Sequence, residues 1–326
     1  MECRQLVLTG WHDRCLGEAI HTRFRVLTMA IRTYSWRTWW LTLAVLAGIS
    51  AAGCMVLEVN ERELVYRPVR EYVRTPADQG LAYDELWLTV ARDNGAGTER
   101  VHAWWLPAAA ADAPTLLYLH GTRWSLGNSL FRIARLHGLG FNILAIDYRG
   151  FGRSDGDLPS ESQIKADARA AWTEVVRREP RADRRYIYGH SLGAAVAIEL
   201  GATQDGAAGV IAESGFTSLA DVMADRNLPV GMLMTQRFDA LASVPLLRVP
   251  VLFIHGTADD VVPAAMTQRM FDAAPEPKRL LLIEGGGHSD FGDAGADDYR
   301  RVLTEFIETA QSSAHLREAK SAANTY

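Results

Sequence analysis

Three residue types that together perform acyl transfer stand at suitable places in this chain: a serine, a histidine and an aspartate. Ser191 is the centre of Gly189-His190-Ser191-Leu192-Gly193, between a run of strand-forming residues and an Ala-rich stretch. A serine in such a strand-to-helix turn takes strained backbone angles, and the two glycines let strand and helix close around it. The pattern therefore predicts a nucleophile whose hydroxyl stands clear of a sheet, since an ordinary turn would not need both glycines.

A serine hydroxyl needs a base to take its proton, and the base needs an acid to orient it. We predict that His288 is the base, because it follows the last predicted strand on a run of glycines that lets the backbone bend inward. Asp259 is the predicted acid, since it follows the preceding strand and stands four residues before Pro263, which would start a helix. Its neighbour Asp260 and the more distant Glu213 are the alternatives.

The oxyanion that forms when serine attacks a carbonyl needs fixed N–H donors. The first predicted donor is the N–H of Leu192, directly after the nucleophile, and the second is the N–H of Thr122, in the loop after His120-Gly121. His120 could serve as a second base, but we prefer a structural role in positioning this loop. This chemistry uses no metal and no organic cofactor.

The elements that must hold these groups alternate between strands and helices. A hairpin is expected at 86–90 and 101–106, followed by strands at 115–119, 142–146, 185–188, 209–212, 251–254 and 279–283, with helical patterns at 130–136, 161–178 and 298–310. Near-continuous apolar strands separated by helices indicate a mostly parallel sheet that is buried on both faces. In such sheets ligands bind outside the carboxyl ends of the strands, which is where the candidate residues fall.

These motifs give the chain a family resemblance. It resembles the α/β-hydrolase superfamily, and within it the serine hydrolases of the Bem-type and protein-depalmitoylase branch with their bacterial relatives. The matching phrases lie between about residues 60 and 310 and are Leu119-His120-Gly121, 147–154, 189–193, the segment around Asp259, and Gly287-His288. The resemblance implies the α/β-hydrolase fold with the triad in the order Ser, Asp, His.

One departure from that resemblance bears on the site. Relatives commonly have Asn-Ala after the His-Gly pair, whereas this chain has Thr122-Arg123-Trp124, so the second oxyanion donor and the local pocket differ from the usual pattern. The resemblance also implies that Arg149 is a buried ion-pair partner and not a catalytic residue.

The predicted organisation has three parts. Residues 1–57 form an N-terminal extension with a lipoprotein-type signal or a membrane anchor, residues 58–310 the hydrolase domain, and residues 311–326 a flexible tail. Within the first part of the domain, residues 58–76 are interpreted as a tether. A small cap of two short helices is expected at about 217–248, where methionines either pack or form an adaptable wall for an acyl chain.

The N-terminal extension contains an uncharged run, Trp39 to Leu57, preceded by arginines. Read from Met29, which could be the true start, it looks like a secretory signal that ends in the small residues 51–53 before Cys54, as in bacterial lipoproteins. An uncleaved signal anchor and a buried soluble helix are the alternatives. The first two place the catalytic domain outside the cytoplasm, in the cell envelope, with the bacterial periplasm as the expected compartment.

Composition excludes several other classes. The chain has 326 residues, a formal net charge of −5 and three cysteines, all near the N-terminus, so neither a nucleic-acid footprint nor a disulfide framework is expected. The predicted function is hydrolysis of carboxylic esters or thioesters, with a small-molecule or lipid-like acyl ester as substrate and the oligomeric state left open. A serine aminopeptidase and a catalytically silent, membrane-tethered binding module are the alternatives. The peptidase would need an acidic group in the cap, for which Asp221, Asp225 and Asp239 are candidates.

Overall fold

The computed structural model describes residues 36–72, 74–93, 95–228, 231–289 and 295–323. The chain divides into two compact units, Met1–Val59 and Asn60–Tyr326. The second unit contains every strand that the structure describes and all of the candidate site residues.

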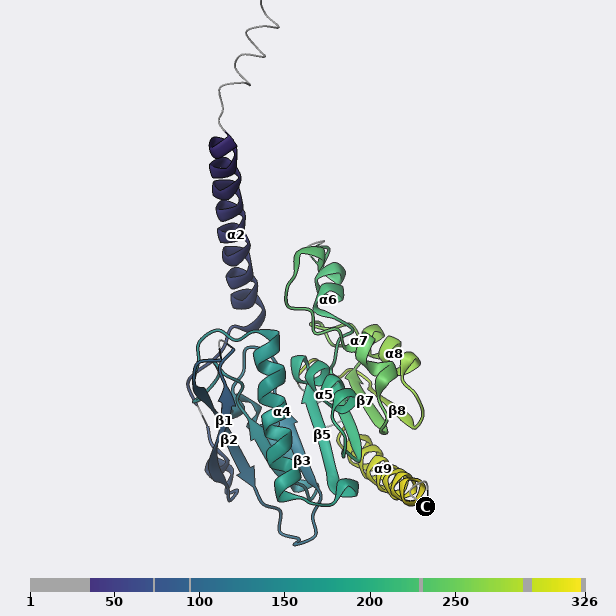
Figure 1. The fold of residues 1–326 in the computed structure, drawn as a ribbon. Coiled ribbons are helices and arrows are strands. Elements are labelled where there is room, and N and C mark those ends of the chain that lie inside the picture. The colour runs from purple at the N-terminus through teal and green to yellow at the C-terminus, as the bar shows by residue number, and fades with distance from the viewer. Residues whose placement is uncertain (1–35, 73, 94, 229–230, 290–294, 324–326) are drawn as a thin grey trace, which may run out of the picture. The chain divides into compact units, whose positions relative to one another are not determined.

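Eight strands form one sheet, most of it parallel (Figure 1). They are β1 (Asp84–Ala91), β2 (Thr98–Leu106), β3 (Thr115–Leu119), β4 (Asn142–Ile146), β5 (Arg185–His190), β6 (Gly209–Glu213), β7 (Val251–Gly256) and β8 (Lys278–Ile283). Their order across the sheet is β1-β2-β4-β3-β5-β6-β7-β8. β1 pairs antiparallel with β2, and β2 with β4, whereas all other neighbours are parallel. Among the described strands β2 alone runs opposite to the rest, so the carboxyl ends of the other seven lie at one edge of the sheet.

Helices cover both faces of this sheet, and Figure 1 shows two of them, α4 and α5, on the face toward the viewer. The longer helices of the second unit are α3 (Leu126–Gly138), α4 (Glu161–Arg178), α5 (Leu192–Thr203), α8 (Ala264–Ala273) and α9 (Ala296–Ala323). Alternate residues of a strand face opposite sides. Leu117 and Leu119 of β3 join one core with α4, α5 and α8, whereas Leu116 and Tyr118 join the other with α3 and α9. The predicted α/β-hydrolase fold is confirmed.

Short helices occupy the segment between β6 and β7, at the place predicted for a cap. They are α6 (Leu219–Asp225), η3 (Gly231–Leu233), α7 (Ala240–Ser243) and η4 (Val244–Leu246), and two further single turns, η1 (Pro76–Gln79) and η2 (Ala182–Arg184), lie elsewhere. Residues 229–230 and the side chain of Met232 lie outside the described residues. Within the cap, Leu219 and Val222 are buried, which gives α6 an apolar face.

The prediction of a flexible tail from residue 311 is wrong as far as Ala323, because α9 continues to that residue. Its later turns are held by tertiary contacts: Ala314 is buried, His315 Nε2 lies 3.1 Å from Asp183 Oδ2, and Arg317 donates a hydrogen bond to the carbonyl of Ala207. Small and polar residues gave no apolar period, so the sequence alone carried no helix signal there.

The tether predicted for residues 58–76 is partly wrong as well, because helix α2 (Trp36–Tyr66) extends into it. Tyr66 is fully buried, and its hydroxyl donates a 2.7 Å hydrogen bond to Gln236 Oε1. Arg62 Nε donates to the carbonyl of Pro159 at 2.8 Å. The last turns of α2 are thus an integral part of the second unit.

The predictions for the N-terminal extension concern residues of which little is described. Among the helices in the described part of the chain, none combines the length and the apolar character that crossing a membrane requires. Residues 1–35, with Met29, and the side chain of Cys54 lie outside the described residues. The lipoprotein signal, the anchor and the envelope location therefore stay predictions.

Candidate active site

The turn that carries Ser191 has the strained geometry that its sequence predicts. Ser191 lies between β5 and α5 with φ 56° and ψ −117°, backbone angles that L-residues rarely adopt. A Cβ on Gly189 would lie 1.9 Å from the carbonyl oxygen of Gly193, and one on Gly193 would lie 2.1 Å from that of Leu119. Both positions therefore require glycine. The N–H of Ser191 donates a 2.9 Å hydrogen bond to the carbonyl of Glu213, which fixes the turn to β6.

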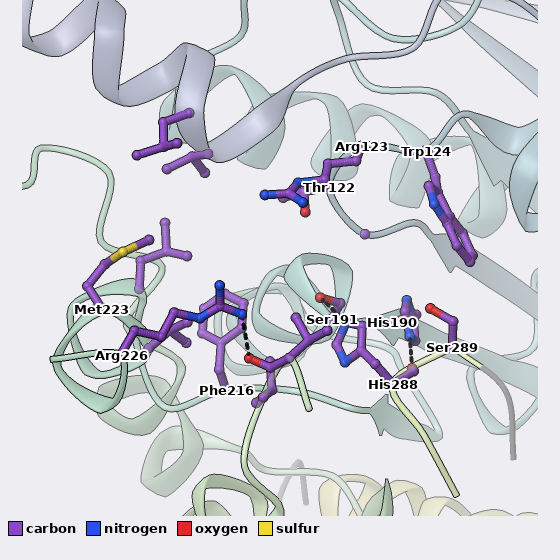
Figure 2. Close-up of a pocket in the computed structure, with 17 residues that line it drawn as sticks. Thr122, Arg123, Trp124, His190, Ser191, Phe216, Met223, Arg226, His288 and Ser289 are labelled. Carbon is purple, nitrogen blue, oxygen red and sulfur yellow. Dashed lines mark hydrogen bonds between the residues drawn. The ribbon is translucent and has the colours of Figure 1, made fainter. Parts of the chain in front are cut away.

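The three predicted residues meet at the carboxyl edge of the sheet. His288 Nε2 lies 3.1 Å from Ser191 Oγ, and His288 Nδ1 lies 2.7 Å from Asp259 Oδ2. Figure 2 shows the His288 ring beside Ser191, joined to it by a dashed line. Both distances are within the range of a hydrogen bond, so a proton can pass from the hydroxyl to the imidazole while the carboxylate holds the ring.

The carboxylate of Asp259 is enclosed and fully hydrogen-bonded. Its Oδ1 accepts the N–H groups of Val261 at 2.9 Å and Val262 at 2.8 Å, and its Oδ2 faces both His288 and His255 Nε2, the latter at 3.1 Å. Burial by itself raises the pKa of Asp259, but the hydrogen bonds from His255 and His288 outweigh it and hold the pKa well below its usual range. Asp259 is therefore a stable anion behind the imidazole.

The loops that carry the acid and the base touch through their main chains. A Cβ on Gly256, at the end of β7, would lie 2.1 Å from the carbonyl oxygen of Gly286. That same carbonyl accepts the N–H of Ala258 at 2.9 Å. Because the contact is between backbones, the spacing of the two loops does not depend on side-chain packing.

The alternative acids lie elsewhere. Asp260 is exposed, and no described residue hydrogen-bonds to its carboxylate. Glu213 is fully buried at the end of β6, where its carboxylate lies 2.6 Å from Arg132 Nε and 3.1 Å from Arg135, and accepts the hydroxyls of Tyr188 and Tyr299. Burial raises the pKa of Glu213, but the charges of Arg135 and Arg132, together with the hydrogen bond from the Tyr188 hydroxyl, outweigh burial and lower the pKa to about 2. Of the three acids considered, Asp259 alone lies behind His288.

Arg132 connects this buried cluster to the loop of the base. Its guanidinium donates a 2.8 Å hydrogen bond to the carbonyl of Ser289, the residue after His288. On the other side, His190 Nε2 lies 2.9 Å from the carbonyl of His288 and serves as its donor. Burial, then the charge of Arg132, lowers the pKa of His190 well below its ordinary value, so His190 stays neutral. Both contacts fix the main chain that presents the imidazole.

Replacing Glu213 by glutamine is expected to lower the free energy of unfolding by about 3–5 kcal/mol, because two guanidinium groups lose their buried counter-charge. The sign with pH follows from the lowered pKa. The carboxylate stabilises the fold at pH values above 4.5, its pKa in the unfolded chain. This stabilisation is lost as the pH falls toward 2, its pKa in the folded protein. Urea unfolding between pH 7 and pH 3 measures both effects.

The control for that experiment is Glu305→Gln, which removes a surface carboxylate paired with Arg279. A solvated pair contributes little, so this variant should keep the stability and the acid profile of the parent. If the Glu213→Gln and Glu305→Gln variants unfold alike at every pH, the buried cluster has no such stabilising role.

The predicted oxyanion donors lie beside the nucleophile. Leu192 is the first residue of α5, and the N–H groups of a first turn have no partner within their own helix. Gly121 packs so closely that an added Cβ would lie 3.1 Å from the Ser191 Cβ, which brings the following residue, Thr122, to the same cavity. Their role as donors stays a prediction.

Two residues to which we gave structural roles have structural surroundings. His120 is fully buried, with its ring 4.6 Å from that of Tyr148, and its Nδ1 lies 2.7 Å from the carbonyl of Gly121, so it orders the loop after β3. Arg149 is buried with its Nε 2.8 Å from Asp167 and its Nη1 3.1 Å from Glu99. Neither side chain lines the cavity.

A cavity of about 240 Å³ opens in front of Ser191. Its apolar wall includes Phe216, Leu219, Val222 and Met223 from the cap segment. Figure 2 shows two arginines at this cavity as well, Arg123 and Arg226. Within the described residues, no cluster of three or more His, Cys, Asp or Glu side chains could hold a metal ion.

Sequence reasoning did not identify some residues that contribute to this site. His255, the second contact of Asp259, directly follows the strand predicted at 251–254 and precedes a glycine, and this position could have drawn notice. Arg132, within α3, and Arg226, directly after α6, gave no such signal, because each lies in a different segment of the chain from the nucleophile.

Comparisons with known proteins agree with the fold and place the chain in a family. The model of a family described as serine aminopeptidase, S33, matches residues 111–238 and 231–295, which is more than half of the chain. The chain is 34% identical over 274 residues to the uncharacterized protein Rv2307c of Mycobacterium tuberculosis, which covers 81% of this chain and 94% of that protein. It is 27% identical over 289 residues to the α/β hydrolase domain-containing protein WAV2 of Arabidopsis thaliana, with 80% and 92% covered.

A solved structure with the same fold is the esterase Pf2001 of Pyrococcus furiosus. It matches with a TM-score of 0.61 and 21% identity, and the match covers 75% of this chain and 99% of that one. This likeness shows the fold alone. The sheet, the family match and the curated relatives agree with one another. The chain therefore belongs to the α/β-hydrolase superfamily, within the family described as serine aminopeptidase, S33, and it is a hydrolase.

Proposed function

We propose that this hydrolase cleaves carboxylic esters or thioesters through an acyl-enzyme. The observation that carries the proposal is the pair of hydrogen bonds on His288, 3.1 Å to Ser191 Oγ and 2.7 Å to Asp259 Oδ2. A strained turn holds the serine, and a carboxylate of lowered pKa lies behind the imidazole, as nucleophilic catalysis by serine requires.

In the proposed reaction, Ser191 Oγ attacks the acyl carbon while His288 Nε2 takes the hydroxyl proton. The negative charge that develops on the carbonyl oxygen faces the N–H groups of Leu192 and Thr122. Collapse of the tetrahedral intermediate expels the alcohol or thiol, which receives the proton from His288. A water molecule then attacks the acyl-enzyme in the same way, with His288 as its base, and releases the acid.

The wall of the cavity suits an acyl chain. Phe216, Leu219 and Val222 are buried side chains that offer apolar surface next to the nucleophile. Met223 adds a flexible thioether that can adapt to chains of different shape. A pocket with apolar walls and few polar groups near the reacting atoms is typical of sites for small acyl substrates.

A serine aminopeptidase is the second candidate, because the matched family carries that description. Such an enzyme needs a carboxylate to hold the free ammonium of its substrate. Among the described residues that line the cavity, none is Asp or Glu. Asp221 faces Arg269 at 3.5 Å, Asp239 accepts the N–H of Ala242 at the start of α7, and Asp225 is exposed. Because the described lining contains arginines and no carboxylate, it favours an ester or thioester substrate over a peptide with a free ammonium group.

Labelling of the full chain with a fluorophosphonate tests the nucleophile. The probe should modify the parent and the Ser289→Ala variant, whose serine lines the same cavity, but not the Ser191→Ala variant. Turnover of p-nitrophenyl esters and acyl thioesters against aminoacyl p-nitroanilides then separates the two candidates. Cleavage of the anilides alone would favour the peptidase, and a folded protein that neither reacts nor turns over would be a binding module.

A further inference from the structure

Two arginines flank the cavity of Ser191 on different sides. Arg123 belongs to the loop after β3, and Arg226 directly follows α6 in the cap. Both line the cavity together with Ser191 and His288. In Figure 2 the Arg123 side chain extends over the cavity from the side of Thr122, and that of Arg226 extends toward it from the cap.

Two buried arginines, Arg132 and Arg149, have carboxylate partners, whereas Arg123 and Arg226 are exposed. The pair at the cavity differs. Among the described residues, no carboxylate lies within ion-pair distance of Arg123 or Arg226, and none lines the cavity. Within the described residues, the Arg226 side chain donates one hydrogen bond, and its acceptor is neutral: the carbonyl of Val261, at 3.2 Å. Most of the donors on both guanidinium groups are therefore available to a ligand.

The backbone of Arg123 is held in a strained conformation. Its φ is 65°, in the left-handed region that non-glycine residues rarely adopt, and its N–H donates a 2.9 Å hydrogen bond to the carbonyl of Tyr66. Strained residues persist where the surroundings fix them, often at ligand sites. The pKa of Arg123 is lowered by partial burial and by the positive charges of Arg67 and Arg226, so the local charge is positive.

We propose that the preferred substrate is an ester or thioester that also carries an anion, a carboxylate or a phosphate, which binds between Arg123 and Arg226. The guanidinium groups would hold the anion by charge-assisted hydrogen bonds while the acyl carbon lies at Ser191. The inference rests on the proposed function and narrows its substrate class.

The test compares two chromogenic esters that differ only in charge: 3-octanoyloxy-4-nitrobenzoate and the corresponding neutral benzamide. The full chain should hydrolyse the anionic ester with a kcat/KM about tenfold higher, a difference of about 1.4 kcal/mol. Arg123→Gln and Arg226→Gln should each bring the ratio of the two kcat/KM values down toward one, chiefly through a higher KM for the anionic ester. Added salt should reduce the preference in the parent.

Arg237→Gln is the matched control, because Arg237 is an exposed arginine of the same cap segment that does not line the cavity. It should leave both rates unchanged. Equal rates for the two esters in the parent, or equal losses in all three variants, would overturn the anion site. The proposed function would survive that result, since neutral-ester turnover and its loss in Ser191→Ala are read in the same assay.

Two further experiments show on which side of the ester bond the anion binds and measure binding without turnover. p-Nitrophenyl hemiglutarate carries the charge on the acyl side, whereas the nitrobenzoate carries it on the leaving group, so their preferences show which side the arginines bind. In the Ser191→Ala protein, quenching of the intrinsic tryptophan fluorescence, to which Trp124 at the cavity contributes, reports binding of the uncleaved anionic ester. An octanoyl ester of glycerol phosphate distinguishes a phosphate source from a carboxylate source. Failure of every anion to bind more tightly than the benzamide would also overturn the proposal.

Discussion

Ser191→Ala is expected to lower kcat for ester hydrolysis by roughly 10⁴- to 10⁶-fold, the largest effect of any single change in this protein. The substitution removes only the hydroxyl group, whose oxygen, Oγ, lies 3.1 Å from His288 Nε2. What activity is left would come from binding and from the oxyanion donors. Single-turnover and steady-state rates with a p-nitrophenyl ester measure the loss.

The same position should separate activity from stability. Ser191 has φ 56°, so its backbone conformation is strained by about 1–3 kcal/mol relative to a relaxed residue. Ser191→Ala keeps a Cβ and should unfold like the parent, whereas Ser191→Gly relieves the strain and should be more stable. A Ser191→Ala variant that keeps ester turnover while remaining folded would show that another nucleophile is in use.

Asp259→Asn is expected to lower kcat by roughly 10⁴-fold with little change in KM. Oδ1 of Asp259 accepts two backbone N–H groups, from Val261 and Val262, so the amide oxygen of an asparagine must take that place. Its NH₂ group then faces His288 Nδ1 and donates to it. The imidazole is left with its proton on Nε2, where it cannot accept one from Ser191.

Asp260→Asn is the matched control, since it makes the same chemical change one residue along the chain on an exposed side chain. It should leave kcat and KM as they are. Thermal unfolding of both variants shows whether the Asp259→Asn protein is folded. Equal activities of the two variants would mean that Asp259 does not orient the base.

The parts of the site that follow from local rules were predictable from the sequence. The Ser191 turn needs two glycines at fixed offsets, and Asp259 and His288 follow neighbouring parallel strands, so topology brings them to one edge. The fold follows from the same alternation of apolar strands and helices. These predictions did not require knowing which residues far apart in the sequence contact each other.

The parts that the sequence did not predict depend on contacts between distant segments. The pairing of Arg132 with Glu213 joins residues 81 positions apart, and the meeting of Arg123 with Arg226 depends on where the cap folds. The end of α9 depends likewise on Asp183, which lies far along the chain. A periodic pattern carries no information on such partners, because it reports only which face of an element is apolar.

The main-chain contact at Gly256 has a consequence for how this protein can change over evolutionary time. The loops of Asp259 and His288 are spaced by a contact between backbones, since a Cβ on Gly256 would lie 2.1 Å from the carbonyl oxygen of Gly286. The apolar wall of the cavity is formed instead by side chains of the cap segment, such as Leu219 and Met223. Reactivity and selectivity are thus encoded at separate positions. A lineage, or a directed library restricted to wall residues such as Met223 and Arg226, can explore new substrates while the chemical machinery is inherited intact.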